Sequence, residues 1–427
     1  MTDFGLPSPG DGVALKGIRV LDLTDETGYE AGRFLADWGA EVIKVEPPQG
    51  DSARLRPPFA DNVEDPTRSL FFMARNRNKK GITLDLESDE GRALTKKLIA
   101  SVDVVIETYP VGYLAERGLG YDDLKTDHPG LVYCSITPYG QDGPMSRFRG
   151  SDLTVMAQSG FLDLLGDKDR APLRLQVPQI SQHASEAAAG AIMTALFHRE
   201  NTGEGQYIDT SACQVQVMCG SATNWMTWEV NRSIVKRQGA LIETPSGGYA
   251  LSVFWECADG YVVFVFLPGG MGGGRMMEGM IKWMESEGFD PAPLNEFDWN
   301  TYDIDADYAM QEFIDRYAEP IRRFFKPKTR DEIFEKALGY HIMLYPANDA
   351  STLVENPQLV SRGFWQQVTH DDLGRDVTYP GAPMVMTQTP MRAGERAPHL
   401  GEHTDDVLGA LGLGDDEIAA LRAAKAI

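Results

Sequence analysis

The sequence is poor in cysteine, in basic residues and in long apolar runs. Its four cysteines stand far apart with no CxxC pair, and its seven histidines form no HExxH motif. These patterns argue against a disulfide framework and against a zinc site. The chain has 63 acidic and 40 basic residues, and a net charge of −23 repels nucleic acid and anionic membrane surfaces. No apolar run approaches the roughly 20 residues that span a bilayer.

The first residues, MTDFGLPSPGDG, are acidic and rich in glycine and proline. A secretory or transit peptide has a different composition, with a basic start followed by an apolar or an arginine-rich stretch. We therefore expect a cytoplasmic protein with reduced thiols, no metal, no membrane association and no nucleic-acid partner. With 427 residues, 42% of them apolar, the chain is long enough for two domains that each bury a core.

The first two hundred residues alternate short apolar stretches with amphipathic ones. The amphipathic stretches predict helices, and one of them, SDEGRALTKKLIAS, opens with a serine N-cap and an early acid. The apolar stretches predict strands at 18–24, 41–47, 81–86, 102–108 and 131–137. This alternation is typical of a doubly wound parallel sheet, in which ligands bind beyond the carboxyl ends of the strands. The predicted fold class is α/β, with a Rossmann-like large domain.

The composition changes after about residue 240. A predicted β-hairpin with its turn at Asp259-Gly260 is followed by helical segments rich in methionine and aromatic residues, which favours a smaller α+β domain. From about residue 355 the chain is rich in proline and glycine again. We predict residues 1–225 as the N-terminal part of the large domain, 226–350 as the small domain, and 351–427 as a linker and a return to the large domain.

A few loops carry chemistry that the rest of this acidic chain lacks. The segment NRNKKG (76–81) gathers three cations and two amides, and it fits either a solvated turn or a contact to phosphate. Arg117 stands beside glycines that permit close backbone approach. The segment PGGMGGGR (268–275) matches neither a dinucleotide-binding nor a Walker A pattern. It fits a flexible connector or a lid over a cleft, and we favour a lid formed by Gly272, Gly273 and Gly274.

Taken together, these stretches resemble the class III CoA-transferases, a family that also contains α-methylacyl-CoA racemases. The resemblance spans nearly the whole chain, in the same order as in the family. It is carried by GIRVLDLT, LADWGAEVIKVEPPQGD, NRNKKGITLDL, DVVIETY, YGQDGP, SDLTVMAQSG, RENTGEGQYIDTS and the C-terminal NPQLVSRGFW, PGAP and APHLGEHTDDVL.

The resemblance implies a Rossmann-like large domain, a small domain inserted into it, and two chains interlocked like links, with active sites at the interface. It also implies coenzyme A or acyl-CoA and a carboxylic acid as substrates, without a metal. The CoA contacts that it implies are Glu26, Thr27, Asn76, Lys79, Lys80, Thr108, Tyr109, Arg117, Tyr139 and Asp152.

One departure from the family concerns the nucleophile. Class III enzymes use an aspartate whose carboxylate attacks the donor thioester and forms a mixed anhydride; CoA then forms an aspartyl thioester, and the acceptor acid repeats the sequence backwards. The family's interval back from the TGxG turn, here Thr202 to Gly205, ends near Ser181. No Asp or Glu occurs between Arg170 and Ser185. The resemblance therefore implies a chain without the usual nucleophile.

Three functions remain open at this point. The first is a homodimeric transferase with an unusual nucleophile, for which Glu186 is the nearest acid but stands about one turn away. The second is a racemase or isomerase with His183 as its base, although the racemase His-Asp pair is Ser151-Asp152 here. A lone histidine at a helix start is more often structural. The third, which we favour, is a non-nucleophilic subunit that pairs with a homologous Asp-bearing chain, as in benzylsuccinate CoA-transferase. Succinyl-CoA is the donor that this resemblance favours.

Overall fold

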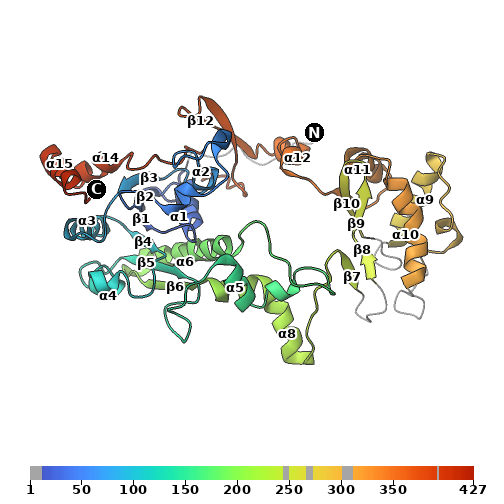
Figure 1. The fold of residues 1–427 in the computed structure, drawn as a ribbon, viewed down its shortest axis with the longest axis horizontal. Helices are drawn as coiled ribbons and strands as arrows, with labels where there is room; N and C mark the ends of the chain where they lie inside the picture. The colour runs from blue at the N-terminus through green and yellow to red at the C-terminus, as the bar shows by residue number, and fades with distance from the viewer. Residues whose placement is uncertain (1–11, 244–249, 266–272, 301–310, 392–393) are drawn as a thin grey trace. The chain divides into compact units, whose positions relative to one another are not determined.

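The computed structural model describes residues 12–243, 250–265, 273–300, 311–391 and 394–427 (Figure 1). Contacts divide the chain into two compact units, and each is described by itself. The large unit comprises Met1–Leu162, Arg174–Arg232 and Pro357–Ile427, and the small unit comprises Asp163–Leu173 and Ser233–Asn356. The small unit thus includes residues 163–173, which the sequence analysis placed in the large domain.

The large unit is built on one parallel sheet of six strands. Its strand order, β3-β2-β1-β4-β5-β6, is that of a doubly wound dinucleotide-binding fold, so the predicted α/β class is confirmed. The sixth strand was not among those predicted. The strands are β1 (Arg19–Leu23), β2 (Glu41–Glu46), β3 (Lys80–Thr83), β4 (Val104–Glu107), β5 (Val132–Thr137) and β6 (Tyr207–Ser211).

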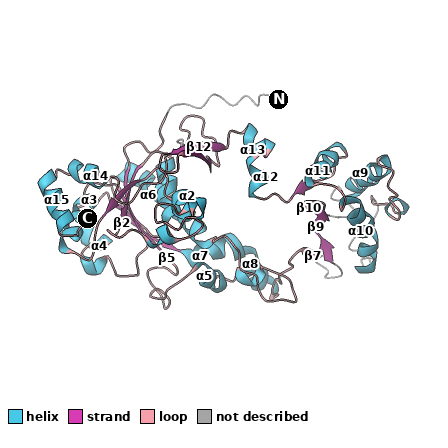
Figure 2. Ribbon diagram, turned by 45° about the horizontal axis from the view of Figure 1, so that its top comes forward, coloured by secondary structure: helices cyan, strands magenta, loops and turns pink. Residues whose placement is uncertain are grey.

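Helices cover both faces of this sheet, and in Figure 2 its strands lie between them. On one face, Leu21 and Leu23 of β1 join a core with α3 (Asp89–Ile99), α14 (Thr404–Ala410) and α15 (Asp415–Ala423). As predicted, a serine caps α3: the Ser88 hydroxyl accepts a hydrogen bond from Gly91 N at 3.0 Å.

The opposite face carries α1 (Tyr29–Asp37) and the long α6 (Ile180–Thr202), which pack against each other. Residues alternate between the two faces of a strand, so Asp22 of β1 points toward α1. Gly32 of α1 lies so close that a Cβ there would stand 2.4 Å from the Asp22 carboxylate. The buried alanines of α6 likewise allow close packing.

The C-terminal segment returns to the large unit and closes the outer edge of β3. Gly81 N donates to His403 Nδ1 at 3.1 Å, His403 N donates to the Gly81 carbonyl at 2.9 Å, and Thr83 N donates to Thr404 Oγ1 at 3.2 Å. The unit also contains α2 (Leu70–Arg75), α4 (Tyr121–Leu124), α5 (Asp152–Gln158), α7 (Ala212–Gln216), α8 (Ala222–Asn231), α13 (Pro357–Ser361) and the hairpin β12 (Trp365–His370) with β13 (Arg375–Pro380).

The small unit buries an aromatic core between a three-stranded antiparallel sheet and its helices. Trp255, Trp283, Phe324 and Phe325 lie at its centre. The predicted hairpin is present and joins β9 to β10, but its turn residues are Ala258 and Asp259, one position earlier than predicted, because Gly260 already pairs with Cys257. The elements are β7 (Leu241–Glu243), β8 (Ala250–Ser252), β9 (Phe254–Cys257), β10 (Gly260–Phe264), α9 (Gly273–Ser286), α10 (Gln311–Phe325), α11 (Arg330–Gly339), β11 (Leu344–Pro346) and α12 (Ala350–Val354).

Candidate active site

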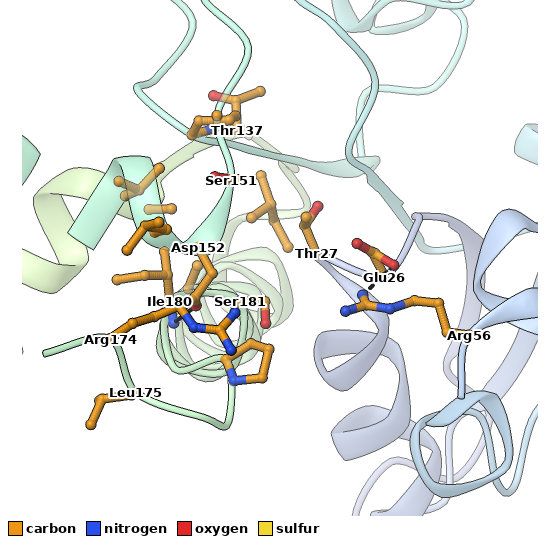
Figure 3. Close-up of a pocket in the computed structure, with 18 of the residues that line it drawn as sticks. Glu26, Thr27, Arg56, Thr137, Ser151, Asp152, Arg174, Leu175, Ile180 and Ser181 are labelled. Atoms are coloured by element: carbon orange, nitrogen blue, oxygen red, sulfur yellow. Dashed lines mark hydrogen bonds and ion pairs between the residues drawn. The ribbon is translucent and has the colours of Figure 1, made fainter. Parts of the chain in front are cut away.

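A cavity of about 340 Å³ lies in the large unit, beyond the carboxyl ends of β1 and β5. Its walls come from the loops after these strands, from the starts of α5 and α6, and from the segment that leads into α6 (Figure 3). The lining residues include Glu26, Thr27, Arg56, Phe71, Asp152, Leu153, Arg174, Leu175, Ile180 and Ser181.

The sheet topology explains why a site forms here. The chain direction around the sheet reverses between β1 and β4, and open α/β sheets bind ligands in the crevice at such a switch point. Glu26 and Thr27 follow β1, while Thr108 and Tyr109 follow β4. A hydrogen bond of 2.7 Å from Asp25 N to Thr108 Oγ1 joins the two loops. The structure thus joins the two loops that carry four of the residues assigned to CoA, and of these four Glu26 and Thr27 line the cavity.

Asp152 fixes the start of α6, and with it the position of Ser181. Its Oδ1 accepts hydrogen bonds from Gln179 N and Ile180 N, both at 2.8 Å. Gln179, the N-cap residue of α6, makes no side-chain capping bond, so this carboxylate from α5 supplies the missing acceptor. Ser181, in the first turn of α6, then lines the cavity together with Glu26 and Asp152.

His183 does not line this cavity. Its Nδ1 lies 2.8 Å from Oε1 of the buried Gln216 in α7, so the imidazole is hydrogen-bonded to this amide. Glu186, the nearest acid, is exposed to solvent on the same helix. The geometry therefore gives His183 a partner in α7 and gives Ser181 the place at the cavity wall.

The basic turn at 76–81 leads into β3, and its two lysines lie in different environments. Lys79 is buried, and its ammonium donates to Asp22 Oδ2 at 2.7 Å, to the Tyr29 carbonyl at 2.9 Å and to Asn76 Oδ1 at 2.9 Å. Burial lowers the pKa of Lys79, and Asp22 opposes that shift. All three donors of the ammonium are occupied, so neither Lys79 nor Asn76 is presented to a phosphate.

Lys80 lies at the end of the sheet where the parallel strands begin, opposite the cavity. It is the first residue of β3, whereas the cavity lies beyond the last residues of the parallel strands. Its Nζ pairs with Glu41 Oε1 at 2.8 Å, at the start of β2. Burial raises the pKa of Glu41, but the hydrogen bond and charge of Lys80, with Arg19, lower it on balance. The structure does not bring Lys80 together with Thr27 or Thr108.

Arg117 and Tyr139 lie outside the cavity wall. The Arg117 guanidinium pairs with both oxygens of Glu87, at 2.9 and 2.8 Å, and lies 3.6 Å above the ring centre of Tyr113. Tyr109 stacks on the same ring, with centres 4.4 Å apart. Tyr139 is half-buried two residues after β5.

Three arginines near the cavity, Arg56, Arg75 and Arg174, were missed by the sequence analysis. Arg56 and Arg75 lie over the ring of Phe71, at 4.2 and 4.1 Å from its centre. Arg56 also pairs with Glu26 (dashed in Figure 3), and Arg174 lines the wall beside α6. The only available signal was isolated arginines in an acidic chain, because chain folding brings segments 56, 71–75 and 174 to one place.

The predicted lid lies only partly in the described chain. Gly272 falls outside the described residues, and Gly273 and Gly274 form the buried first turn of α9. A Cβ on Gly274 would stand 2.3 Å from the side-chain oxygen of Asn300.

Within the described ranges, no group of three or more His, Cys, Asp or Glu side chains is arranged to hold a metal ion. His399 and His403 have the four-residue spacing of some metal sites, but His403 Nδ1 accepts a hydrogen bond from the backbone of Gly81. No described helix combines the length and hydropathy of a membrane span. The four cysteines are free thiols.

Comparisons with known proteins agree on one family. The pattern of CoA-transferase family III matches residues 15–404. The chain is 34% identical to succinyl-CoA:(R)-benzylsuccinate CoA-transferase subunit BbsE of Thauera aromatica over 393 residues, covering 91% of this chain and 92% of that protein. It is 31% identical over 403 residues to succinyl-CoA:glutarate CoA-transferase of Mus musculus, covering 92% and 85%. A CAIB/BAIF family protein from Brucella suis has a similar structure, with a TM-score of 0.75, 27% identity, and coverage of 95% of this chain and 100% of that chain.

Proposed function

Because the chain belongs to CoA-transferase family III, we propose that it is the non-nucleophilic subunit of an acyl-CoA:carboxylate CoA-transferase. In this proposal it works with a homologous chain that carries the nucleophilic aspartate, and the two chains interlock. The observation that carries the proposal is Ser181, which stands in the cavity wall where the resemblance implies that aspartate.

The chemistry of a hydroxyl supports this assignment. A carboxylate nucleophile becomes part of an anhydride and then of a thioester, and both are activated acyl groups that CoA or the acceptor acid can attack. A serine that accepted the acyl group would form an ordinary ester, which is a poor donor for either step. Ser181 therefore lets the cavity bind substrate without forming the usual covalent intermediate.

The named relatives support the substrates. BbsE is described as a subunit, and both BbsE and the mouse enzyme are named for succinyl-CoA as donor. We infer succinyl-CoA as the donor here and a dicarboxylic or aromatic acid as the acceptor.

The exposed surface of α8 supports a partner chain. Trp225, Met226, Trp228 and Val230 of this helix are all exposed in the isolated chain. Large apolar side chains gathered on one short helix are typical of a protein–protein interface. We infer that α8 contributes to the contact with the partner.

The CoA site in this proposal differs from the set that the resemblance implied. Thr27, Thr108 and Tyr109 remain, because the loops that carry them are joined at the switch point. We assign the phosphates of CoA to Arg56 and Arg75 instead of Lys79 and Lys80. Lys79 is buried, and Lys80 lies at the end of the sheet where the strands begin, opposite the cavity. Guanidinium groups suit phosphate because they donate two parallel hydrogen bonds.

A homodimer with an unusual nucleophile is the second candidate, and one observation favours it. Two carboxylates, those of Glu26 and Asp152, line the cavity with Ser181. Glu26 is paired with Arg56, and Asp152 Oδ1 holds the start of α6. Both carboxylates are engaged in contacts that lower their nucleophilicity, so this candidate ranks second.

The test is to incubate the purified chain with succinyl-CoA and to map covalent adducts by mass spectrometry of its peptides. We expect no acyl or CoA adduct and no transfer to an added acid. Ser181→Asp, which restores a carboxylate at the same wall, should acquire a CoA adduct at residue 181. An adduct on Glu26 or Asp152 of the parent would support the homodimer instead.

A second arm of this test concerns His183. In the active assembly, His183→Gln should retain most of the activity, because an amide keeps the hydrogen bond to Gln216 but cannot act as a base. A fall of about a hundredfold without loss of assembly would be the size expected for general-base catalysis and would favour an isomerase.

A further inference from the structure

We propose that the cavity binds the carboxylate of the acid substrate non-covalently, between the guanidinium of Arg174 and the hydroxyl of Ser181. This inference rests on the proposed function. It states that this subunit holds the acid substrate by its carboxylate. It makes Arg174 a specificity-determining residue.

Arg174 has charge to offer. Its side chain extends toward Ser181 in Figure 3. Within the described part of the chain, its polar contact is a 3.4 Å hydrogen bond to the neutral Gln176 Oε1, and it forms no ion pair there. Arg56, the other arginine of the wall, pairs with Glu26 and is assigned to the phosphates of CoA in the proposed function. Arg174 is thus the arginine of this wall whose charge a bound anion can meet.

Ser181 keeps a third carboxylate out of a wall that already contains Glu26, which is paired with Arg56, and Asp152, which accepts two backbone hydrogen bonds. An aspartate at this position would place a negative charge beside the incoming carboxylate and repel it. A serine hydroxyl instead donates a hydrogen bond to it. The substitution that removes covalent chemistry therefore favours reversible binding of the same chemical group.

The apolar residues of the cavity wall indicate which substituent the acid substrate carries besides its carboxylate. Leu153, Leu175 and Ile180 line the cavity near Ser181. A volume of about 340 Å³ is enough for a small organic acid. The site therefore fits an acid with one carboxylate on Arg174 and an apolar substituent against the leucines, and an acid without that substituent should bind less tightly.

The experiment measures binding to the full-length chain by calorimetry, with (R)-benzylsuccinate, succinate and free CoA as separate probes. We expect (R)-benzylsuccinate to bind more tightly than succinate. Arg174→Gln and Ser181→Asp should each weaken (R)-benzylsuccinate binding by about tenfold or more, the size of one charge-assisted contact. CoA affinity should stay within about twofold of the parent in both variants.

Arg147→Gln is the matched control, because Arg147 is exposed and lies outside the cavity wall. Arg174 is exposed too, and an unchanged thermal unfolding midpoint checks that each variant is folded. Parental (R)-benzylsuccinate affinity in the Arg174→Gln variant, or no binding of either acid by the parent, would overturn the inference. A parent that fails to bind CoA would count against the proposed function instead, so the two failures are distinguishable.

Discussion

Glu107 is a carboxyl that the fold keeps away from water at the switch point of the sheet. It is the last residue of β4, it is buried, and its Oε2 accepts a hydrogen bond of 2.6 Å from Tyr109 N. Burial, assisted by the charges of Asp25 and Asp209, raises its pKa to about 7. The folded protein therefore holds a proton on Glu107 at pH values where the unfolded chain has released it.

This shift predicts a pH-dependent effect of Glu107→Gln. Since the folded pKa lies above the ordinary value of about 4.3, the contribution of Glu107 to stability falls as the pH rises from about 4.5 to 7. Glutamine mimics the protonated acid, so it should match the parent at pH 4.5 and exceed it by about 3 to 4 kcal/mol at pH 8. Urea unfolding at both pH values measures this difference.

Glu116→Gln serves as the control, because Glu116 is an exposed carboxylate in the loop that follows the same strand. Its stability difference from the parent should not change with pH. An equal gain for Glu107→Gln at both pH values would contradict the buried, protonated carboxyl.

At the scale of elements, α6 depends on an acceptor from outside itself. Asp152 is the first residue of α5, and its carboxylate binds two backbone N–H groups at the start of α6. A negative charge at this place also interacts favourably with the positive N-terminal end of the helix dipole. One side chain therefore connects the two helix starts that form the cavity wall around Ser181.

Asp152→Ala should lower the free energy of unfolding by about 1 kcal/mol, the usual loss for a helix-capping acceptor. Asp152→Asn keeps the oxygen and should lose only part of this amount. Chemical unfolding measures the stability of both variants, and hydrogen exchange at Gln179 and Ile180 should report faster opening in Asp152→Ala. Parental exchange at these two amides would show that the contact does not hold the helix start.

Prediction from sequence was successful where the signal was local. Five of the six strands follow from short apolar runs, whereas β6 has Tyr207 exposed and Asp209 in its middle, so its pattern is that of a half-exposed strand. The candidate Ser181 came from an interval along the chain, and the structure places it in the cavity wall.

Failures arose where strand direction or tertiary packing decides. Lys79 and Lys80 are neighbours in sequence. Lys79 points into the core beneath α1, whereas Lys80 lies where the parallel strands begin, at the opposite end of the sheet from the cavity. Composition cannot separate two such lysines. Arg56, Phe71 and Arg75 come together only through the packing of α2 on the preceding loop.

At the scale of the whole molecule, the sheet separates two basic regions. Lys80, Arg19 and Glu41 lie where strands begin, and Arg56 and Phe71 lie with the cavity beyond the ends of the strands. Arg75 is largely buried beside Phe71, its contact to Glu30 is 3.5 Å long, and burial lowers its pKa. A phosphate would relieve the incomplete pairing of this arginine.

This separation predicts which cations CoA uses. Arg56→Gln and Arg75→Gln should each weaken CoA binding about 10- to 100-fold, as loss of a charge-assisted contact worth about 1.5 to 3 kcal/mol does. Lys80→Gln, the matched control, should bind CoA like the parent. Calorimetry with free CoA distinguishes the cases, and a loss confined to Lys80→Gln would move the site to the other edge of the sheet.

The return of the C-terminal segment to β3 has a consequence for how the protein is made. The backbone N–H of Thr83 donates to Thr404, which is synthesised 321 residues later. At about 5 to 20 residues per second, a ribosome needs roughly 15 to 60 seconds to synthesise that interval. During this time β3 presents open backbone groups to other nascent chains, and unprotected strand edges promote aggregation. The yield of folded protein therefore depends on keeping that edge apart from other chains until residues 403 and 404 have left the ribosome.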